Sequence, residues 1–345
     1  MKIIVTGAAG FIGSNFVYYY LSRYPKRTII GIDNLSYVGN LENLSHLSPD
    51  QKARFFFEKA DITDPIQIGE IFSLYPIDGI INFAAETHVD RSIHDPQIFL
   101  RTNIMGTHVL LEAAKNTWYS KDGHWKEGKK FLQVSTDEVY GALGVTGSFT
   151  ENSPLDPHSP YSASKASADL VVKVYRDTYG MPVNITRCSN NFGPWQFPEK
   201  LIPLIINNAL LHKQIPVYGD GQQIRDWLYV EDHCRAVDLV FEEGKAGEIY
   251  NIGGNNEREN IAIIREILAL LQEMTGDPLI NDSLISYVTD RPGHDRRYSI
   301  NATKIKKDLR WVPLMSFEEG IVRTVKWYLD HQEWMNKQIS RMIGS

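Results

Sequence analysis

Cysteine is scarce in this sequence, and its scarcity excludes the small folds that depend on disulfide bonds. The 345 residues include two cysteines, Cys188 and Cys234, and no Cys-x-x-Cys pair. A disulfide framework or a zinc knuckle needs more cysteines at closer spacing. We expect both thiols to be small buried side chains in a reducing compartment. We also expect no metal site, because no His, Cys or Asp cluster has the spacing of metal ligands.

Long apolar runs and an excess of positive charge are also missing. The opening stretch MKIIVTGAAGFIGS resembles a signal peptide at first, but Gly7, Gly10 and Gly13 interrupt its apolar run. The net charge is −6, from 36 basic and 42 acidic residues, so the chain has no overall basic field to attract a nucleic acid. We therefore expect a cytoplasmic protein without nucleic-acid or membrane partners.

The sequence does contain short runs of branched apolar residues that alternate with longer amphipathic stretches. This alternation predicts an α/β fold with a doubly wound parallel sheet. The expected strands are 2–6, 28–32, 53–60, 79–84, 131–136 and 183–187, and the expected helices are 11–23, 65–75, 96–117, 161–179, 200–211, 260–275 and 317–329. After about residue 188 the loops become rich in Gly, Pro and aromatic residues. We expect residues 1–188 to form the main domain and residues 189–345 a smaller α/β ligand-binding region, from which elements such as GEIYNIGG may return to the main sheet.

A glycine-rich turn, TGAAGFIGS, links the first expected strand to the first helix. Gly7 permits the tight turn, Gly10 lets the backbone approach a pyrophosphate, and Gly13 allows the helix to pack closely on the strand. The helix N-terminus then faces the phosphate charge. Asp33 lies 20 residues beyond Gly13, at the end of the second strand, where a carboxylate accepts both ribose hydroxyls. Because no Arg occupies residues 32–36, this Rossmann-like turn favours NAD over NADP.

A second motif, YSASK, begins the helix expected at 161–179. Its spacing places Tyr161 and Lys165 on one helix face. A neighbouring lysine stabilises the tyrosine phenolate, so the tyrosine can take a proton from an alcohol near neutral pH. Tyr-x-x-x-Lys is common on helix surfaces and alone would not indicate a catalytic pair. Together with the nucleotide-binding turn upstream, it favours a redox site.

These motifs together resemble the extended short-chain dehydrogenase/reductase family, which has the same glycine turn, a small-residue segment like FAAETH, a Ser-Thr at the end of the fifth strand, and Tyr-x-x-x-Lys. The resemblance implies that Tyr161 is the catalytic base, that Lys165 binds the nicotinamide ribose and lowers the pKa of Tyr161, and that Thr136 hydrogen-bonds the reacting oxygen. The expected NAD-binding set is Gly7, Gly10, Phe11, Ile12, Gly13, Asp33, Asn34, Asp61, Ile62, Ala84, Ala85, Thr87, Thr102, Tyr161, Lys165 and Asn191.

The adjacent carboxylates of STDEVYG, Asp137 and Glu138, narrow the resemblance further. Within the family this stretch is similar to that of the nucleotide-sugar 4,6-dehydratases, as are ETHVDRSI, RCSNNFGPWQFPEKLIP and DRPGHDRRYSI. Oxidation of a sugar at C4 acidifies the hydrogen at C5, and loss of water across C5 and C6 then needs a base and an acid. The resemblance assigns Glu138 as the base at C5 and Asp137 as the acid at O6.

Two conditions follow for this pair. Neighbouring side chains of a regular strand point to opposite faces, so the strand must end at or before Thr136 for both carboxylates to reach one sugar. We also expect the pKa of Asp137 to be raised by its charged neighbour and by a dry pocket. The alternative is that Asp137 and Glu138 merely form an acidic first turn of a short helix.

The resemblance implies that dTDP-glucose is the substrate, that its product supplies deoxysugar (dTDP-rhamnose) biosynthesis, and that a homodimer forms through helices 96–117 and 161–179. The expected substrate-binding set is Thr87, His88, Thr136, Asn190, Lys200, Leu201, Pro216, Tyr218, Arg225, Asn260, Arg291 and His294. The remaining alternatives are a dehydratase of CDP-, UDP- or GDP-linked sugars, a nucleotide-sugar 4-epimerase, and a non-catalytic NAD-binding regulator.

Overall fold

Within residues 1–290 and 292–344, which this computed structural model describes, seven parallel strands form the main sheet in the order β10-β6-β5-β4-β1-β2-β3. Their bounds are β1 (Lys2–Thr6), β2 (Thr28–Asp33), β3 (Phe55–Lys59), β4 (Gly79–Asn82), β5 (Lys130–Thr136), β6 (Val183–Cys188) and β10 (Ile249–Ile252). The predicted doubly wound parallel sheet is confirmed. The GEIYNIGG segment supplies β10, which pairs with β6.

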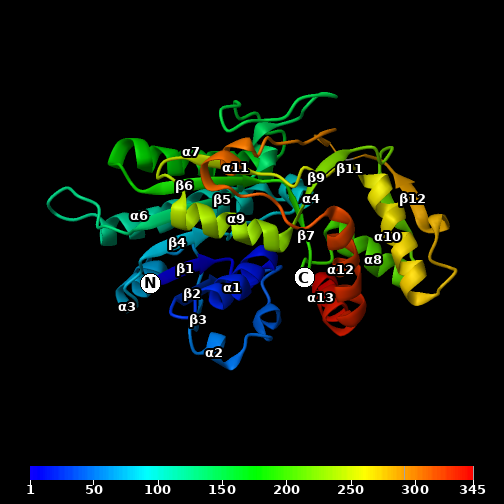
Figure 1. Cartoon of the computed structure of the whole chain (residues 1–345), viewed down its shortest axis with the longest axis horizontal. Helices are drawn as coiled ribbons and strands as arrows, with labels where there is room; N and C mark the ends of the chain where they lie inside the picture. The colour runs from blue at the N-terminus through cyan, green and yellow to red at the C-terminus, as the bar shows by residue number, and fades with distance from the viewer. Residues whose placement is uncertain (291, 345) are drawn as a thin grey trace.

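Helices cover both faces of this sheet, as Figure 1 shows. Helices α1 (Phe11–Arg23), α9 (Val230–Glu243) and α11 (Thr303–Leu309) lie on one face, and α3 (Pro65–Leu74), α6 (Thr107–Trp118) and α7 (Pro160–Tyr179) lie on the other. Strand β1 shows why: Ile3 and Val5 pack among α1 and α9, whereas Ile4 packs among α3 and α6. Because both faces are buried, the strands are almost continuously apolar.

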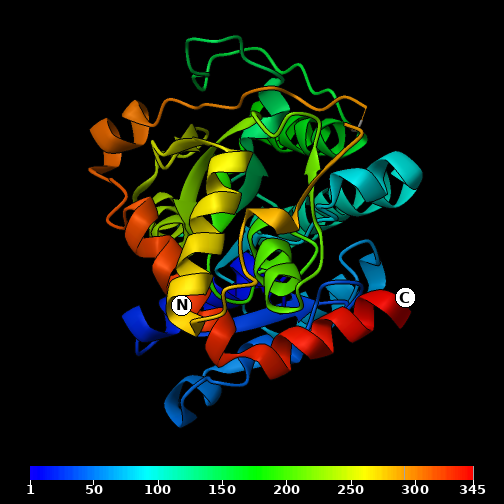
Figure 2. The same ribbon diagram turned by 90° about the vertical axis from the view of Figure 1, so that its right-hand side faces the viewer.

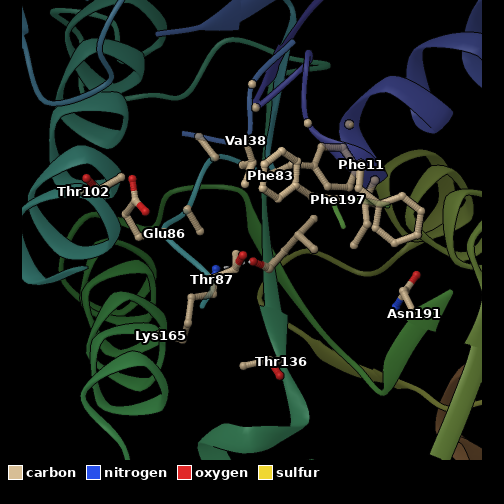
Figure 3. Close-up of a pocket in the computed structure, with 18 of the residues that line it drawn as sticks. Phe11, Val38, Phe83, Glu86, Thr87, Thr102, Thr136, Lys165, Asn191 and Phe197 are labelled. Atoms are coloured by element: carbon tan, nitrogen blue, oxygen red, sulfur yellow. Dashed lines mark hydrogen bonds between the residues drawn. The ribbon is translucent and has the colours of Figure 1, made fainter. Parts of the chain in front are cut away.

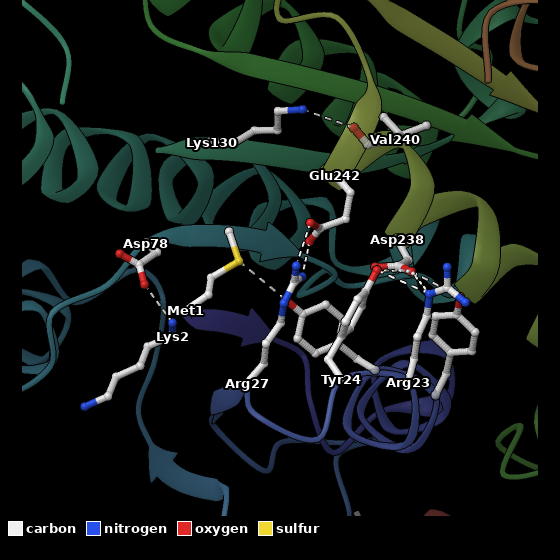
Figure 4. A network of polar contacts seen from close by, with 12 residues as sticks. Met1, Lys2, Arg23, Tyr24, Arg27, Asp78, Lys130, Asp238, Val240 and Glu242 are labelled. Carbon is white, nitrogen blue, oxygen red and sulfur yellow. Dashed lines mark hydrogen bonds and ion pairs between the residues drawn. The ribbon is translucent and has the colours of Figure 1, made fainter. Parts of the chain in front are cut away.

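A polar network fastens α1 to α9 at one end of the sheet (Figure 4). The guanidinium of Arg27 forms an ion pair with Glu242, and the Tyr24 hydroxyl donates to Oδ2 of Asp238 at 3.1 Å. Burial is the largest cause that raises the pKa of Asp238, to about 6. Helix α9 was not predicted, and this network ties it to the end of α1, which lies more than 200 residues earlier in the chain.

The helix predicted at 96–117 contains a π-helical segment. It consists of α5 (Pro96–Phe99), the π-helix η2 (Leu100–Gly106) and α6. A Cβ at Gly106 would lie 2.5 Å from the Ile62 side chain, so the segment packs closely on the loop after β3. Such wide turns recur at functional sites because they redirect side chains. The π-turn places Thr102 on the cavity described below.

The C-terminal region has its own apolar core, separate from the two cores of the main sheet. It contains α8 (Leu201–Leu210), α10 (Asn260–Thr275), α12 (Phe317–Asp330) and α13 (Gln332–Gly344), the sheet β11 (Glu257–Glu259)-β9 (Ile224–Tyr229)-β7 (Asn190–Phe192), and the pair β12 (Ile285–Val288)-β8 (Ile215–Tyr218). Figure 1 shows α8, α10 and α12 gathered at one end of the molecule. The predicted helices at 200–211, 260–275 and 317–329 match α8, α10 and α12.

Short elements complete the described chain. They are η1 (Leu41–Leu44), α2 (Pro49–Lys52), α4 (Val89–His94), the 3₁₀ helix η3 (Asp137–Tyr140) and η4 (Asp282–Leu284). Across the part of the chain that the structure describes, no helix has both the length and the apolar character needed to span a bilayer.

Candidate active site

A cavity opens at the carboxyl ends of the parallel strands, where doubly wound sheets bind their ligands. Most of the residues predicted for the site line it: Gly7, Gly10, Phe11, Ile12, Gly13, Asp33, Asn34, Ile62, Ala84, Ala85, Thr87, Thr102, Thr136, Asp137, Glu138, Tyr161, Lys165, Asn190, Asn191 and Lys200. The close-up in Figure 3 shows part of this lining, with Thr136 and Lys165 at the lower side.

The glycine turn after β1 has the geometry that a pyrophosphate requires. Gly7 has φ +63°, and a Cβ there would lie 2.9 Å from the backbone of Ala84. A Cβ at Gly13 would lie 2.0 Å from the Gly7 carbonyl oxygen, so only glycine lets α1 pack this closely. At Gly10 the nearest atom is the Gly7 oxygen, at 3.3 Å. The turn therefore leaves backbone N–H groups accessible at the N-terminus of α1.

Asp33 is the last residue of β2, and its carboxylate is held by two backbone donors. The N–H of Ala9 donates to Oδ2 at 3.0 Å, and the N–H of Leu35 donates to Oδ1 at 2.9 Å. Burial raises the pKa of Asp33, while these two donors lower it. The carboxylate is thus fixed at the strand end with lone pairs left for ribose hydroxyls, so the residues around it fit an NAD adenosine.

Tyr161 and Lys165 line the same cavity as Thr136. Helix α7 begins at Pro160 with a capping box in which the Ser162 N–H donates to the Ser159 hydroxyl at 3.0 Å. Lys165 Nζ donates to the Val134 carbonyl at 2.7 Å, which fixes the lysine against β5. Burial lowers the pKa of Lys165.

The expected lowering of the Tyr161 pKa is not what the structure shows. Burial, and next the charge of Glu138, raise the pKa of Tyr161 well above its usual value, while the hydrogen bond with Thr136 lowers it. The reason is that Tyr161 is almost fully buried beside two carboxylates, and that Lys165 directs its ammonium to the Val134 carbonyl.

The carboxylate pair meets both conditions set by the sequence. Strand β5 ends at Thr136 and the backbone turns at once into η3, where the Glu138 N–H donates to Oγ1 of Thr136 at 3.3 Å. Asp137 and Glu138 both line the cavity. Burial, and next the charge of Glu138, raise the pKa of Asp137 well above its usual value. Among the described residues, Oδ2 of Asp137 has no hydrogen-bond partner.

Several cavity residues were not predicted. Glu86 lies in the FAAETH loop, with its N–H donating to Oδ1 of Asn103 at 2.9 Å. Val38, Phe83 and Phe197 add apolar walls (Figure 3). Glu86 lies within the FAAETH motif, which was recognised for its small residues. A carboxylate in that motif was the signal that could have identified Glu86 as a site residue. Phe197 lies within the stretch RCSNNFGPWQFPEKLIP, but the sequence did not show which of its side chains would face the cavity.

Some predicted site residues lie off this cavity. They are Asp61, His88, Leu201, Pro216, Tyr218, Arg225, Asn260 and His294, and Arg291 lies outside the described residues. The Asp61 carboxylate accepts from the Thr63 N–H at 2.8 Å, which stabilises the turn after β3. Its neighbours Ala60 and Ile62 line the cavity instead.

The off-cavity residues form smaller groups. The ring of Tyr218 meets that of His294 edge-on at 6.3 Å, and its hydroxyl lies 3.5 Å from Oδ2 of Asp90. His88 caps α4 by accepting from the Arg91 N–H at 3.2 Å. Lys200 Nζ donates to the Thr87 carbonyl at 3.0 Å, and so links α8 to the same loop.

Arg225 is buried next to the carboxylate turn. Its guanidinium stacks 4.2 Å from the ring centre of Tyr298 and donates to the Asp295 carbonyl at 2.9 Å. Its positive charge partly offsets the rise in the pKa of Asp137. Within residues 1–290 and 292–344, no three His, Cys, Asp or Glu side chains are grouped to hold a metal ion.

The fold and this site define the class of protein. The model of the family described as GDP-mannose 4,6 dehydratase matches residues 4–324, and the chain belongs to that family.

Similar proteins within this family carry the name dTDP-glucose 4,6-dehydratase. A dTDP-glucose 4,6-dehydratase of Salmonella typhimurium is 51% identical over 345 residues, which cover 97% of this chain and 95% of that protein. The crystal structure of a dTDP-glucose 4,6-dehydratase from Bacillus anthracis in complex with NAD has a TM-score of 0.85 at 46% identity and covers 98% of this chain and 99% of that one. The crystal structure of the Streptomyces venezuelae enzyme of the same name, also with NAD bound, has a TM-score of 0.87 at 44% identity. It covers 98% of this chain and 100% of that one.

Proposed function

We propose that this protein is a dTDP-glucose 4,6-dehydratase, a hydro-lyase that converts dTDP-glucose to dTDP-4-keto-6-deoxyglucose with tightly bound NAD. The observation that carries the proposal is the turn at the end of β5, which brings Asp137 and Glu138 into the cavity that Tyr161 and Lys165 line. An epimerase needs no acid and base at this position. The relatives of the same name, about half identical over nearly the full chain, support the proposal.

The cavity fits NAD along its whole length. The glycine turn receives the pyrophosphate, Asp33 accepts from the adenosine ribose, and Asn191, Thr102 and Lys165 face the nicotinamide half. NAD would supply the acceptor for the hydride that leaves C4 of the sugar and, once reduced, the donor of that hydride to C6. The other assigned cofactor-contacting residues are Phe11, Ile12, Asn34, Asp61, Ile62, Ala84, Ala85 and Thr87.

Tyr161, Thr136 and Lys165 handle the oxygen at C4. Tyr161 takes the hydroxyl proton, Thr136 donates to the same oxygen, and Lys165 holds the nicotinamide ribose. The raised pKa of Tyr161 means that its phenol is protonated at neutral pH. We infer that Tyr161 acts as a base only when a positive charge lies close to it, and bound NAD would supply such a charge.

Asp137 and Glu138 carry out the elimination. Glu138 removes the proton from C5, and Asp137 gives a proton to the departing O6 hydroxyl. A raised pKa suits Asp137 to this role, because an acid must hold its proton at the working pH. The unpartnered Oδ2 supplies the group that faces the leaving oxygen.

The remaining assignments concern the substrate nucleotide and the assembly. We assign Asn190, Lys200, Leu201, Pro216, Tyr218, Arg225, Asn260, Arg291 and His294 to the nucleotide, with Arg225 and Arg291 for its phosphates, and Thr87 and His88 to the glucose. Residues 1–188 form the NAD-binding domain and residues 189–345 the nucleotide-sugar region, apart from α9, β10 and α11, which return to the main sheet. The protein acts in the cytoplasm, in dTDP-rhamnose biosynthesis, as a homodimer.

One incubation tests the proposal. The purified protein is mixed separately with dTDP-glucose, UDP-glucose and CDP-glucose, and the products are weighed by mass spectrometry. We expect dTDP-glucose to lose one water and the other two to react far more slowly. Loss of water from UDP- or CDP-glucose alone would assign another dehydratase, and an unchanged mass with all three would contradict the proposal.

A further inference from the structure

The C-terminal helix α13 lies along the loop that follows β2, although the two are almost 300 residues apart in sequence. Figure 2 shows this helix, in red, running beside the blue N-terminal segments. The indole Nε1 of Trp334 donates to Oδ1 of Asn43 at 3.0 Å, and the Arg341 guanidinium donates to the Gly39 carbonyl at 3.0 Å. Gly39 itself lines the cavity. The helix lies beyond the segment 4–324 that the family model matches.

Trp334 is connected to Asp33 through a chain of hydrogen bonds. The buried Asn43 accepts from Trp334 and donates from Nδ2 to the Ala9 carbonyl at 2.9 Å. Ala9 belongs to the glycine turn, and its N–H donates to Oδ2 of Asp33 at 3.0 Å. Both amide atoms of Asn43 are thus used, one toward the helix and one toward the cofactor turn.

The same tryptophan supports a second cavity loop. The Trp334 ring packs edge-on against Trp195, with centroids 5.5 Å apart. Trp195 lines the cavity and has φ +69°, a conformation that costs a bulky residue energy and persists only where its neighbours enforce it. Next to it, the Tyr328 hydroxyl of α12 donates to the Gln196 carbonyl at 2.6 Å.

The loop after β2 and the loop after β7, both of which Trp334 contacts, meet at the cavity. The ring of Tyr37, from the loop after β2, contacts that of Phe197, from the loop after β7, at a centroid distance of 5.2 Å. Between them Val38 and Phe197 line the cavity near Asp33. An outgoing dinucleotide would have to separate these loops.

We propose that Trp334 is a positioning residue that holds loops 34–44 and 194–200 over the adenosine half of the cofactor cavity, and so slows the release of NAD. The inference rests on the proposed function in taking NAD as the occupant. One neutral hydrogen bond contributes about 0.5–1.5 kcal/mol, which corresponds to roughly a two- to tenfold change in rate.

The test measures how fast bound NAD exchanges with isotopically labelled NAD, without any sugar present. Trp334→Phe keeps an aromatic ring, although a smaller one than the indole, and removes the N–H donor, so we expect exchange roughly two- to tenfold faster. Gln332→Ala, on the exposed face of the same helix, is the matched control and should leave exchange unchanged. Adding Trp334→Phe to Asn43→Ala should accelerate exchange by less than the product of the single effects, because both remove the same bond.

Thermal unfolding of each variant without NAD separates this role from general stability. A lower unfolding temperature with wild-type exchange would overturn the inference, as would fully multiplicative effects of the two substitutions. If Trp334→Phe does not fold, Trp334→Met, which also lacks an N–H donor, takes its place, because Asn43→Ala alone also removes the hydrogen bond to Ala9. Failure of the wild-type protein to bind NAD at all would instead contradict the proposed function.

Discussion

Asp137 and Glu138 are adjacent in sequence but have different surroundings. Asp137 is 1% exposed and carries a strongly raised pKa, whereas Glu138 is half-buried at the cavity wall. The acidic first turn that the sequence offered as the alternative is present in η3, and the same turn brings both side chains to the cavity that the proposed acid and base would need. A short 3₁₀ helix achieves what a continued strand would prevent.

Replacing Asp137 tests its proposed role as the acid that protonates the departing O6 hydroxyl. Asp137→Asn keeps the size of the side chain but cannot give up a proton, so we expect the 4-keto sugar to form while water loss slows by about 10²- to 10⁴-fold. In the wild-type protein, activity should decline as the pH rises through the raised pKa of Asp137. Product formation in single turnovers measures both the rate of water loss in Asp137→Asn and the pH dependence of the wild-type protein. Water loss at the wild-type rate in Asp137→Asn would exclude the acid role.

Replacing Glu138 tests the base. Glu138→Gln should still form the 4-keto sugar, yet its C5 hydrogen should exchange with solvent deuterium at least about a hundred times more slowly. Nuclear magnetic resonance of the recovered sugar measures the exchange, with the Asp137→Asn protein as the control that retains the base. Unimpaired exchange in Glu138→Gln would remove the assignment.

At the scale of elements, the packing of α1 on α9 depends on a buried carboxylate. The pKa of Asp238 rises from 3.8 to about 6 mainly through burial. The folded protein therefore holds this proton more tightly than the unfolded chain, and its contribution to stability is present below about pH 4 and lost as the pH rises through about 6. At about 1.4 kcal/mol for each pKa unit, the loss is about 3 kcal/mol by neutral pH.

Asp238→Asn removes this ionisation. Relative to wild type, the unfolding free energy of the variant should improve by up to about 3 kcal/mol between pH 4 and pH 7. Urea unfolding of both proteins across that pH range measures the difference in unfolding free energy. The change of this difference with pH is the relevant quantity, because the variant also loses the Arg23 ion pair. A difference that is constant with pH would show that Asp238 titrates normally.

The elements that sequence patterns located best are those whose signals are local. Branched apolar runs gave β1 to β6, and α1 and α10 begin and end at their predicted residues. The π-turn at 100–106 was missed because its residues have the pattern of an ordinary helix, and the close approach of Gly106 to Ile62 that accompanies it is a long-range contact. Helices α9 and α13 were missed, since their partners, α1 and the loop after β2, are remote in the chain.

At the scale of the whole molecule, an exposed apolar face supports the proposed homodimer. Leu170 and Val174 of α7 are 52% and 53% exposed, and Leu100 and Met105 of the neighbouring π-helix are 45% and 52% exposed. Leu170 and Val174 lie four residues apart and so share one face of α7, and α7 packs against the π-helix that carries Leu100 and Met105. A second copy of the chain would cover this apolar patch.

Charges in this patch should separate the copies. We expect Leu170→Lys with Val174→Lys to convert a dimer into a monomer in analytical ultracentrifugation, because two desolvated ammonium groups on each side oppose contact. Val145→Lys, at a 94% exposed position outside the patch, is the control. A wild-type protein that sediments as a monomer would contradict the proposed dimer.

The whole site could be predicted from sequence only in part. The glycine turn, Asp33, Tyr161, Lys165 and the carboxylate pair follow fixed spacings on single elements, and the structure gathers them in one cavity. Glu86 and Phe197 were missed because loops from different strands place them. Tyr218 and His294 meet each other away from this cavity, in a region whose arrangement depends on long-range packing.

The fate of the hydrogen at C4 tests the central claim most directly. The protein is incubated with dTDP-glucose that carries deuterium at C4, in ordinary water, and the product is examined by nuclear magnetic resonance. We expect a 4-keto-6-deoxy sugar with the label in the C6 methyl group. A product that keeps the label at C4, as a 4-epimer would, or one in which C6 is still hydroxylated, would contradict it.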